Sequence, residues 1–182
     1  MKRWALLALL LAGPAAGQQP ARPVVPLDNL LAALKAAPNE QAAAALEAQI
    51  RQLWAQAASP AVRLLLARGM RELSEHAAGD ALDSFDAALD LSPDLLEGWR
   101  GRAEARRGLG DEIGAVHDVE EWLRREPRSF LAFEELSVIA GLRQDWRGAL
   151  AAWTKVLELS PNTPGGQERL RDLKRRALGE DM

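Results

Sequence analysis

A period of 34 residues governs most of this chain. Three prolines stand 34 residues apart, at Pro93, Pro127 and Pro161. Three alanines, each twelve residues before one of those prolines, keep the same spacing: Ala81, Ala115 and Ala149. A fixed period of this length in a short chain is typical of stacked supersecondary units, each of which buries its apolar face against the next. The chain is therefore predicted to be a solenoid that works by offering a surface.

Three units follow one another without insertion, at residues 62–95, 96–129 and 130–163. Position 4 of each unit is large and apolar, position 8 is small, and position 24 is large or β-branched. These residues are Leu65, Trp99 and Phe133; Gly69, Ala103 and Ser137; and Phe85, Val119 and Trp153. Small residues at positions 8 and 20 let two helices approach closely, and a proline at position 32 ends or restarts a helix. Each unit is thus predicted to be helix A, a short turn, helix B and a proline-marked turn.

This order of large, small, alanine, aromatic and proline positions resembles the tetratricopeptide repeat (TPR). The resemblance covers the 102 residues of the three units. It implies an all-α fold, a right-handed superhelical solenoid of helix hairpins with capping helices. Nine helices are predicted, at residues 27–37, 39–58, 60–76, 79–91, 94–108, 111–124, 128–141, 145–158 and 164–178.

Two departures from the repeat pattern stand out. Unit two has Val119 where its neighbours have an aromatic residue, and Trp122 where they have a smaller one. A paired exchange of this kind conserves core volume, which packed cores tolerate. In unit one the Gly79–Asp80 turn signal comes later than Gly110–Asp111 of unit two. The turn between the helices of unit one is therefore expected to have a different shape.

Residues 1–17 have the composition of a secretory signal peptide. Lys2 and Arg3 give a positive start, residues 4–12 are apolar, and small residues precede a cleavage site after Gly17. Nine apolar residues are far short of the ~20 that span a bilayer, so no stable membrane span is expected after cleavage. We expect an exported, periplasmic protein that begins at Gln18. A frayed cytosolic N-terminus and an uncleaved short anchor remain as alternatives.

The segments that flank the three units are predicted to be a linker and two caps. Residues 18–26 contain three prolines and are predicted to be a linker. Residues 27–61 are predicted to be a degenerate helix pair that caps the N-terminal end of the solenoid, with Asn39 capping its second helix. Residues 164–182 are predicted to form a capping helix and tail. The basic face of that helix is either a solvated surface or a contact for an anionic partner.

The sequence offers no catalytic, metal-binding or cofactor-binding site. It has no cysteine, and its two histidines, His76 and His117, lack the spacing of metal ligands. Residues 108–110 have a glycine-rich pattern, but they fall in a predicted helix–helix turn and not after a strand, so no phosphate loop is expected. The net charge of −3, which becomes −5 without residues 1–17, argues against nucleic-acid binding. A protein without enzymatic activity and without cofactors is predicted.

The TPR resemblance implies that positions 2, 5, 6, 9 and 12 of each helix A line a concave groove that binds a peptide. The candidate groove residues are Arg63, Leu66, Met70, Leu73, Arg100, Gly101, Glu104, Arg107, Leu131, Glu134 and Val138. The family's carboxylate-clamp version requires lysine, arginine or asparagine at five of the groove positions. Leu66, Met70, Gly101, Leu131 and Glu135 stand there instead, so capture of a C-terminal carboxylate in that manner is not expected.

The expected ligand is a segment with apolar anchors and some negative charge. Leucine and methionine suit an adaptable apolar contact, and arginines suit acidic side chains. Glu97 and Glu104 are spaced to pair with Arg100 and Arg107 on the same helix. A self-neutralised face and a site for an acidic ligand therefore both remain open.

Two classes of function follow. The first is a non-catalytic scaffold that binds a protein or peptide segment on the concave face in the bacterial cell envelope. The second is a structural or assembly component that oligomerises or docks through its convex face or terminal helices. Trp146 is either an exposed contact for such docking or a residue that packs between adjacent repeats. The identity of the partner and the oligomeric state are left open by the sequence.

Overall fold

The computed structural model describes residues 26–55 and 59–179, and these residues form nine α-helices and no strand. The helices are α1 (Leu27–Lys35), α2 (Glu40–Ala55), α3 (Pro60–Ser74), α4 (Ala78–Leu91), α5 (Leu96–Gly108), α6 (Glu112–Arg125), α7 (Phe130–Leu142), α8 (Trp146–Leu159) and α9 (Gly166–Leu178). The all-α class and the helix order are as predicted. The expected signal peptide at residues 1–17, and the linker at 18–26 except for Pro26, lie outside the described residues.

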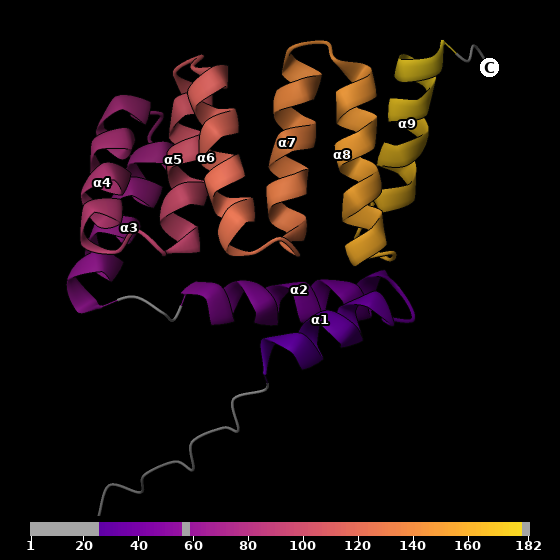
Figure 1. Ribbon diagram of the computed structural model, residues 1–182, viewed down its shortest axis with the longest axis horizontal. Coiled ribbons are helices and arrows are strands. Elements are labelled where there is room, and N and C mark those ends of the chain that lie inside the picture. The colour runs from indigo at the N-terminus through magenta and orange to yellow at the C-terminus, as the bar shows by residue number, and fades with distance from the viewer. Residues whose placement is uncertain (1–25, 56–58, 180–182) are drawn as a thin grey trace, which may run out of the picture.

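Helices α3 to α8 stand side by side as three hairpins, and α9 follows them at the C-terminal end (Figure 1). Each hairpin pairs a helix A with a helix B: α3 with α4, α5 with α6, and α7 with α8. The alanines of the 34-residue period are fully buried: Ala81, Ala115 and Ala149. In the third hairpin the Ser137 hydroxyl also donates a hydrogen bond of 3.0 Å to the Ala149 carbonyl. Small residues thus let the two helices of each hairpin touch.

The turn inside the hairpin has the same backbone feature in all three units. His76, Gly110 and Gln144 occupy the same repeat position, and their φ angles are +60°, +77° and +59°. This left-handed conformation favours glycine, which only unit two supplies. The expectation of a differently shaped turn in unit one is therefore wrong. Gly79 does not form that turn, because it already lies in α4.

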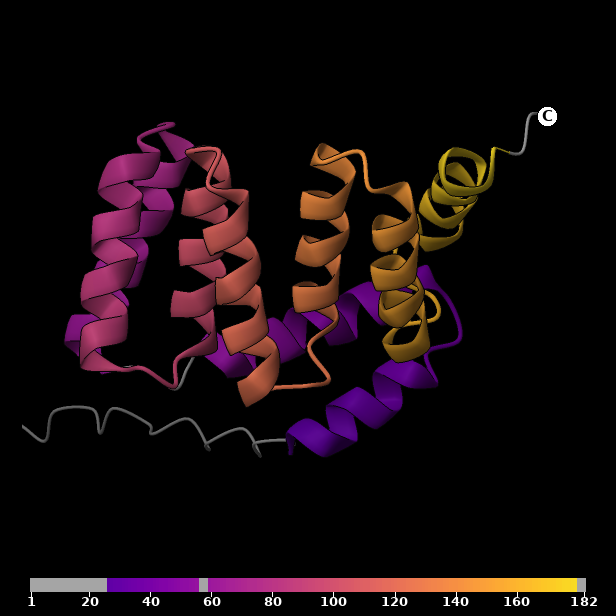
Figure 2. The same ribbon diagram turned by 45° about the horizontal axis from the view of Figure 1, so that its top comes forward.

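The N-terminal helix pair is present, but it does not cap the first hairpin as expected. Helix α2 crosses the lower ends of the upright helices, with α1 beside it (Figures 1 and 2). Its buried residues Ile50 and Trp54 share one apolar cluster with Leu34 of α1 and Phe130 of α7. Leu96 of α5 and Leu131 of α7 pack against that cluster. The pair docks there because the first turns of α5 and α7 present large apolar side chains that α1 and α2 help to cover.

Polar contacts fix the helix pair to the inter-hairpin turns. The Asn162 amide donates a hydrogen bond of 2.8 Å to the Ala37 carbonyl, and the Arg128 guanidinium lies 2.6 Å from the Asp28 carboxylate. As predicted, Asn39 caps α2, and its side chain accepts a bond of 2.9 Å from the backbone N–H of Ala42. The pair therefore braces the second and third hairpins from one side.

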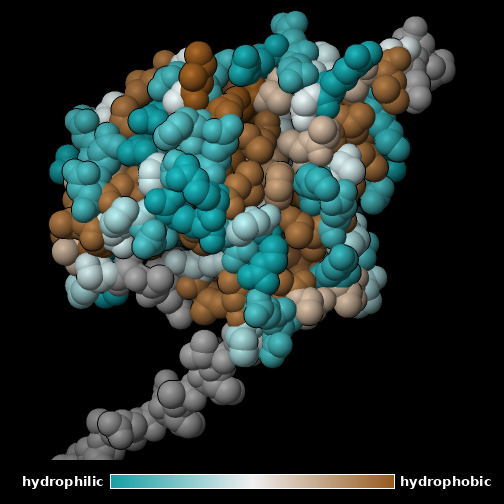
Figure 3. Space-filling model, in the orientation of Figure 1, coloured by the Kyte–Doolittle hydropathy of each residue, from teal (hydrophilic) through white to brown (hydrophobic). Residues whose placement is uncertain are grey.

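The seam between the first two hairpins is closer than the seam between the last two. Helix α5 presents Gly101 to the ring of Phe85, and a Cβ atom added there would lie 2.2 Å from a ring carbon. The equivalent residue of α7 is Glu135. A cleft of about 430 Å³ lies between α6, α7 and α8. Figure 3 shows apolar side chains around this hollow, which faces the viewer.

Helix α9 closes the C-terminal end of the solenoid. Leu173 is fully buried, and the Asp172 carboxylate pairs with Arg175 at 3.3 Å and Arg176 at 3.0 Å. The Arg176 guanidinium lies 4.7 Å from the centroid of the Trp146 ring. Of the two interpretations of Trp146, packing between neighbouring helices is the one that the structure supports.

Candidate functional site: the concave groove

Two adjoining pockets form a groove on the side of the solenoid lined by the A helices. The first, of about 270 Å³, is lined by Arg63, Leu66, Ala67, Met70, Phe85 and Glu97. The second, of about 420 Å³, is lined by Arg51, Gln52, Glu97, Arg100 and Leu131. Glu97 lines both pockets, so they adjoin at this residue. One end is apolar and belongs to α3, while the other end is charged and lies between α2, α5 and α7.

The structure brings five of the predicted groove residues into these pockets: Arg63, Leu66, Met70, Arg100 and Leu131. Other candidates lie elsewhere. Gly101 is buried beneath the Phe85 ring, so it belongs to the seam between hairpins and leaves no room for a ligand. Leu73 packs against the buried cluster around Phe85. Val138 is 39% exposed but lines neither pocket.

The arginines expected to select an acidic ligand already have acidic partners. The Arg100 guanidinium lies 2.8 Å from Glu97 and 3.3 Å from Glu104, and it also contacts the Met70 sulfur at 3.3 Å. Arg107 binds Glu135 of the next A helix at 2.7 Å, and not Glu104 as its helical spacing suggested. The middle of the concave face is therefore self-neutralised, which is one of the two alternatives left open by the sequence.

Helix α2 contributes two groove residues that the sequence did not indicate, Arg51 and Gln52. They lie outside the repeat register, so no periodic pattern could assign them to a groove. The Arg51 side chain is 45% exposed and approaches the Glu47 carboxylate only to 3.9 Å. Arg51 is therefore more available to an acidic ligand than Arg100 or Arg107.

Glu134, another predicted groove residue, is half-buried on α7, within electrostatic range of Glu47 and Arg51 of α2. Within the described part of the chain its carboxyl makes no hydrogen bond and no ion pair. Burial raises the pKa of Glu134 to about 7, and the neighbouring Glu47 carboxylate adds to this rise while Arg51 opposes it. Glu134 is thus a half-buried carboxyl of α7 beside α2, and it lines neither pocket.

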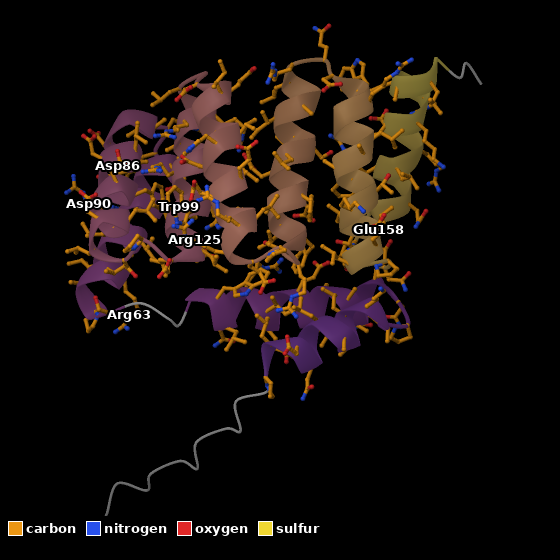
Figure 4. All side chains as sticks on the ribbon, viewed as in Figure 1. Arg63, Asp86, Asp90, Trp99, Arg125 and Glu158 are labelled. Atoms are coloured by element: carbon orange, nitrogen blue, oxygen red, sulfur yellow. The ribbon has the colours of Figure 1, made fainter. Side chains whose placement is uncertain are left out.

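The remaining arginines of α5 form an internal network on the opposite side. Arg102 and Arg106 bind the fully buried Asp118 of α6 at 2.7 Å and 3.0 Å. Two guanidiniums lie over the Trp99 ring, that of Arg102 at 4.6 Å and that of Arg125 at 4.5 Å from its centroid. Figure 4 shows Trp99 and Arg125 side by side. The network joins α5 to α6, so these arginines are structural.

In residues 26–55 and 59–179, no cluster of three or more His, Asp or Glu side chains is arranged to hold a metal ion. No helix in the same residues has the length and apolar character needed to cross a membrane. His117 is 62% exposed on α6, and the nearest carboxylates, of Asp118 and Glu121, lie 3.9 Å and 4.0 Å away.

Comparisons with known proteins point to one kind of repeat. Over 153 residues the chain is 29% identical to a TPR repeat-containing protein of Rhizobium etli, a match that covers 84% of this chain and 75% of that protein. The first TPR domain of Spaghetti (RPAP3), solved with an HSP90 peptide, superimposes with a TM-score of 0.60 at 21% identity, over 65% of this chain and 94% of that one. The MamA protein gives a TM-score of 0.57 at 12% identity, over 82% of this chain and 80% of its own. No protein-family model matches the sequence.

Proposed function

We propose that this chain, a tetratricopeptide-repeat protein, is a non-catalytic scaffold that binds a polypeptide segment in its concave groove. The observation that supports the proposal most strongly is the pair of adjoining pockets that share Glu97. Its apolar end is formed by Leu66, Ala67 and Met70, and its charged end includes Arg51 of α2. A cavity that combines an apolar pocket with a few polar groups is the usual form of a binding site.

The structural neighbours support a polypeptide as the ligand. The RPAP3 domain was solved with a peptide bound, and its similarity extends over most of the repeat region of this chain. Repeat solenoids of this kind use extended concave surfaces for recognition. The ligand of this chain is expected to differ in detail, because its groove includes residues of α2 and has apolar side chains where a carboxylate clamp needs polar ones.

The groove favours a segment with one apolar anchor and an acidic residue beyond it. The anchor would occupy the pocket beside Met70, whose thioether adapts to different apolar shapes. The acidic residue would approach Arg51, which has only a distant carboxylate near it. Arg100 would contribute less, because Glu97 and Glu104 already neutralise it.

Peptide display on the purified protein would test this proposal. The recovered sequences should combine a large apolar residue with an acidic one. Met70→Glu should weaken binding of the recovered peptides at least tenfold, because it places a carboxylate in the apolar pocket. Leu91→Glu is the matched control, since Leu91 is 63% exposed at the end of α4 and lines neither pocket. Equal binding to both variants would exclude the groove.

The proposal includes a location in the bacterial cell envelope, which rests on the signal-peptide pattern of residues 1–17. N-terminal sequencing of the protein isolated from its native cells would test it. The expected mature N-terminus is Gln18 in an extracytoplasmic fraction. An intact Met1 in the cytosolic fraction would contradict the location without affecting the groove.

A second candidate function, docking through the convex face, is favoured by the cleft between α6 and α7. Val116, Phe133 and Leu136 line it together with small residues of α8. Ala151 is an exposed residue of its wall, so Ala151→Glu would place a charge there without burying it. If convex docking is the main function, this variant should lose partner binding or self-association, as measured by light scattering, while Met70→Glu should not.

A further inference from the structure

A further pocket lies where the α1–α2 pair meets the turn between the first two hairpins. Its volume is about 380 Å³, which suits a small molecule or a short stretch of a chain. Four apolar and three charged residues line it: Leu27, Trp54, Leu95 and Leu96, with Asp94, Arg125 and Glu126. None of them lines the concave groove or the cleft between α6, α7 and α8, so this pocket is a separate site.

Two hydrogen-bond donors at this pocket have no acceptor in the described residues. The indole N–H of Trp54 is buried, and the whole residue is only 6% exposed. The Nε–H of Arg125 is also buried, and the Asp94 carboxylate lies 3.5 Å from it without forming a hydrogen bond. Buried polar groups are nearly always hydrogen-bonded, because a donor that is removed from water and left unpaired is unfavourable. These two donors therefore indicate an acceptor that the described residues do not provide.

Packing holds both donors in place. The Trp54 ring packs at a tilt of 36° against Phe130, with 6.0 Å between the ring centroids. The Arg125 guanidinium lies 4.5 Å from the centroid of the Trp99 ring, and its Nη1 donates to the Glu121 carboxylate at 2.7 Å and to the Glu121 carbonyl at 2.9 Å. Neither donor can turn to another acceptor without losing these contacts, so a ligand would find both of them preorganised.

The charges around the pocket favour an uncharged acceptor. Glu126 is balanced by Arg128 at 3.0 Å, while Asp94 shares Arg125 with Glu121. Among the described lining residues, no cation is therefore left unpaired for an anionic ligand. A carboxylate or phosphate would approach the carboxylates of Asp94 and Glu126, whereas a carbonyl oxygen would avoid that repulsion.

We infer that this pocket binds uncharged amide carbonyl groups attached to an apolar group, the chemistry of a main chain at an apolar residue. Carbonyl oxygens of the ligand accept hydrogen bonds from the indole N–H of Trp54 and the Nε–H of Arg125. The apolar group lies against Leu27, Leu95 and Leu96. A polypeptide segment and a small free amide share this chemistry. The site is separate from the concave groove, so the inference goes beyond the proposed function.

Titration of the isotope-labelled full chain with N-acetyl-leucinamide, followed by nuclear magnetic resonance, would test the site. The indole N–H signal of Trp54 should move downfield and saturate, because hydrogen bonding deshields the proton. Trp122 is the internal control: its indole N–H is also buried without a partner, but it does not line the pocket, so its signal should stay in place. Trp54→Phe should raise the Kd, read from the amide signals of Leu95 and Leu96, by about fivefold. Met70→Glu should leave this Kd unchanged.

Two further probes give the charge and the source of the ligand. N-acetyl-leucine, which has a carboxylate in place of the terminal amide, should bind about fivefold more weakly, and Asp94→Asn should reduce this difference. Asp94 suits this change because its side chain is 94% exposed. The capped tripeptide acetyl-glycyl-leucyl-glycinamide should bind at least as tightly as N-acetyl-leucinamide if the source is a polypeptide, and more weakly if it is a small free amide.

Four results would overturn the inference. The first is a Trp54 signal that does not move up to the solubility limit of the probe. The second is an equal movement of the Trp54 and Trp122 signals, and the third is an unchanged Kd in a folded Trp54→Phe protein. The fourth is N-acetyl-leucine that binds as tightly as its amide. None of these measurements uses a groove peptide, so a negative result would leave the proposed function untouched.

Discussion

Arg102 of α5 lies 2.7 Å from Asp118 of α6, a carboxylate with no exposed surface. Arg106 approaches the same carboxylate at 3.0 Å. One buried acid therefore holds two arginines of the neighbouring helix and joins helix A to helix B in unit two. Asp118→Ala should lower the free energy of unfolding by ~3 kcal/mol, because removing one member of a buried ion pair leaves the others uncompensated.

Urea unfolding followed by circular dichroism would measure the effect of Asp118→Ala. Asp90→Ala is the control, since Asp90 is an exposed aspartate of α4 (Figure 4). A loss no larger than that of the control would mean that the Asp118 network contributes little to stability.

Two glycines should respond in opposite ways to replacement by alanine, because Gly101 lies in the seam between the first two hairpins and Gly79 does not. Gly101→Ala should destabilise the protein by ~1–3 kcal/mol, because the new Cβ would overlap the Phe85 ring. Gly79→Ala should be neutral or stabilise by up to about 1 kcal/mol, since no atom lies within 4 Å of its added Cβ and alanine is the better helix former. Thermal unfolding of both variants would compare them, and a Gly101→Ala protein as stable as the parent would show that the seam is looser than described.

The left-handed turn residues predict stabilising substitutions. His76→Gly and Gln144→Gly should each raise stability by up to about 1 kcal/mol, because both residues adopt a positive φ that glycine tolerates better. Gly110→Ala should have the opposite effect at the equivalent position of unit two. Melting temperatures would check this set, and a lower value for both glycine variants would argue against the shared turn.

The hydrogen bonds of Glu72 predict that the stability of the protein falls at low pH. Hydrogen bonds from Ser84 and Arg68 lower the pKa of the Glu72 carboxyl, against the opposing effect of burial. A lowered pKa means that its stabilising effect is present above the ordinary value near 4.5 and is lost as the pH falls below it. Glu72→Gln should be less stable than the parent at pH 7 and should approach it at pH 3. A constant gap in melting temperature between the two proteins across this range would contradict the prediction.

The repeat register was predictable because it rests on local spacing. Ala81, Ala115 and Ala149 recur at one interval, and each lies at a contact between two helices that are close in the sequence. The position of α2 was not predictable in this way. It depends on Leu96, Phe130 and Leu131, which come together only when the solenoid has formed. The residues of that surface come from two helices, so no single segment of the sequence shows its apolar pattern.

The charged groove was predicted only in part, for the same reason. Helical spacing paired Arg100 with Glu97 correctly, because both lie on α5. It failed for Arg107, whose partner Glu135 lies 28 residues further along the chain. The turn at His76 was not predicted for a different reason. Glycine is the usual sequence signal for a left-handed turn, and His76 adopts that conformation without being glycine.

The central claim, that the concave groove binds a polypeptide, is tested most directly by titration calorimetry with the tightest peptide recovered by display. The peptide would be titrated into the parent, Met70→Glu and Ala151→Glu proteins at one pH. The account predicts at least a tenfold higher Kd for Met70→Glu and an unchanged Kd for Ala151→Glu. The reverse order, with binding lost in Ala151→Glu and kept in Met70→Glu, would contradict it and assign recognition to the convex cleft.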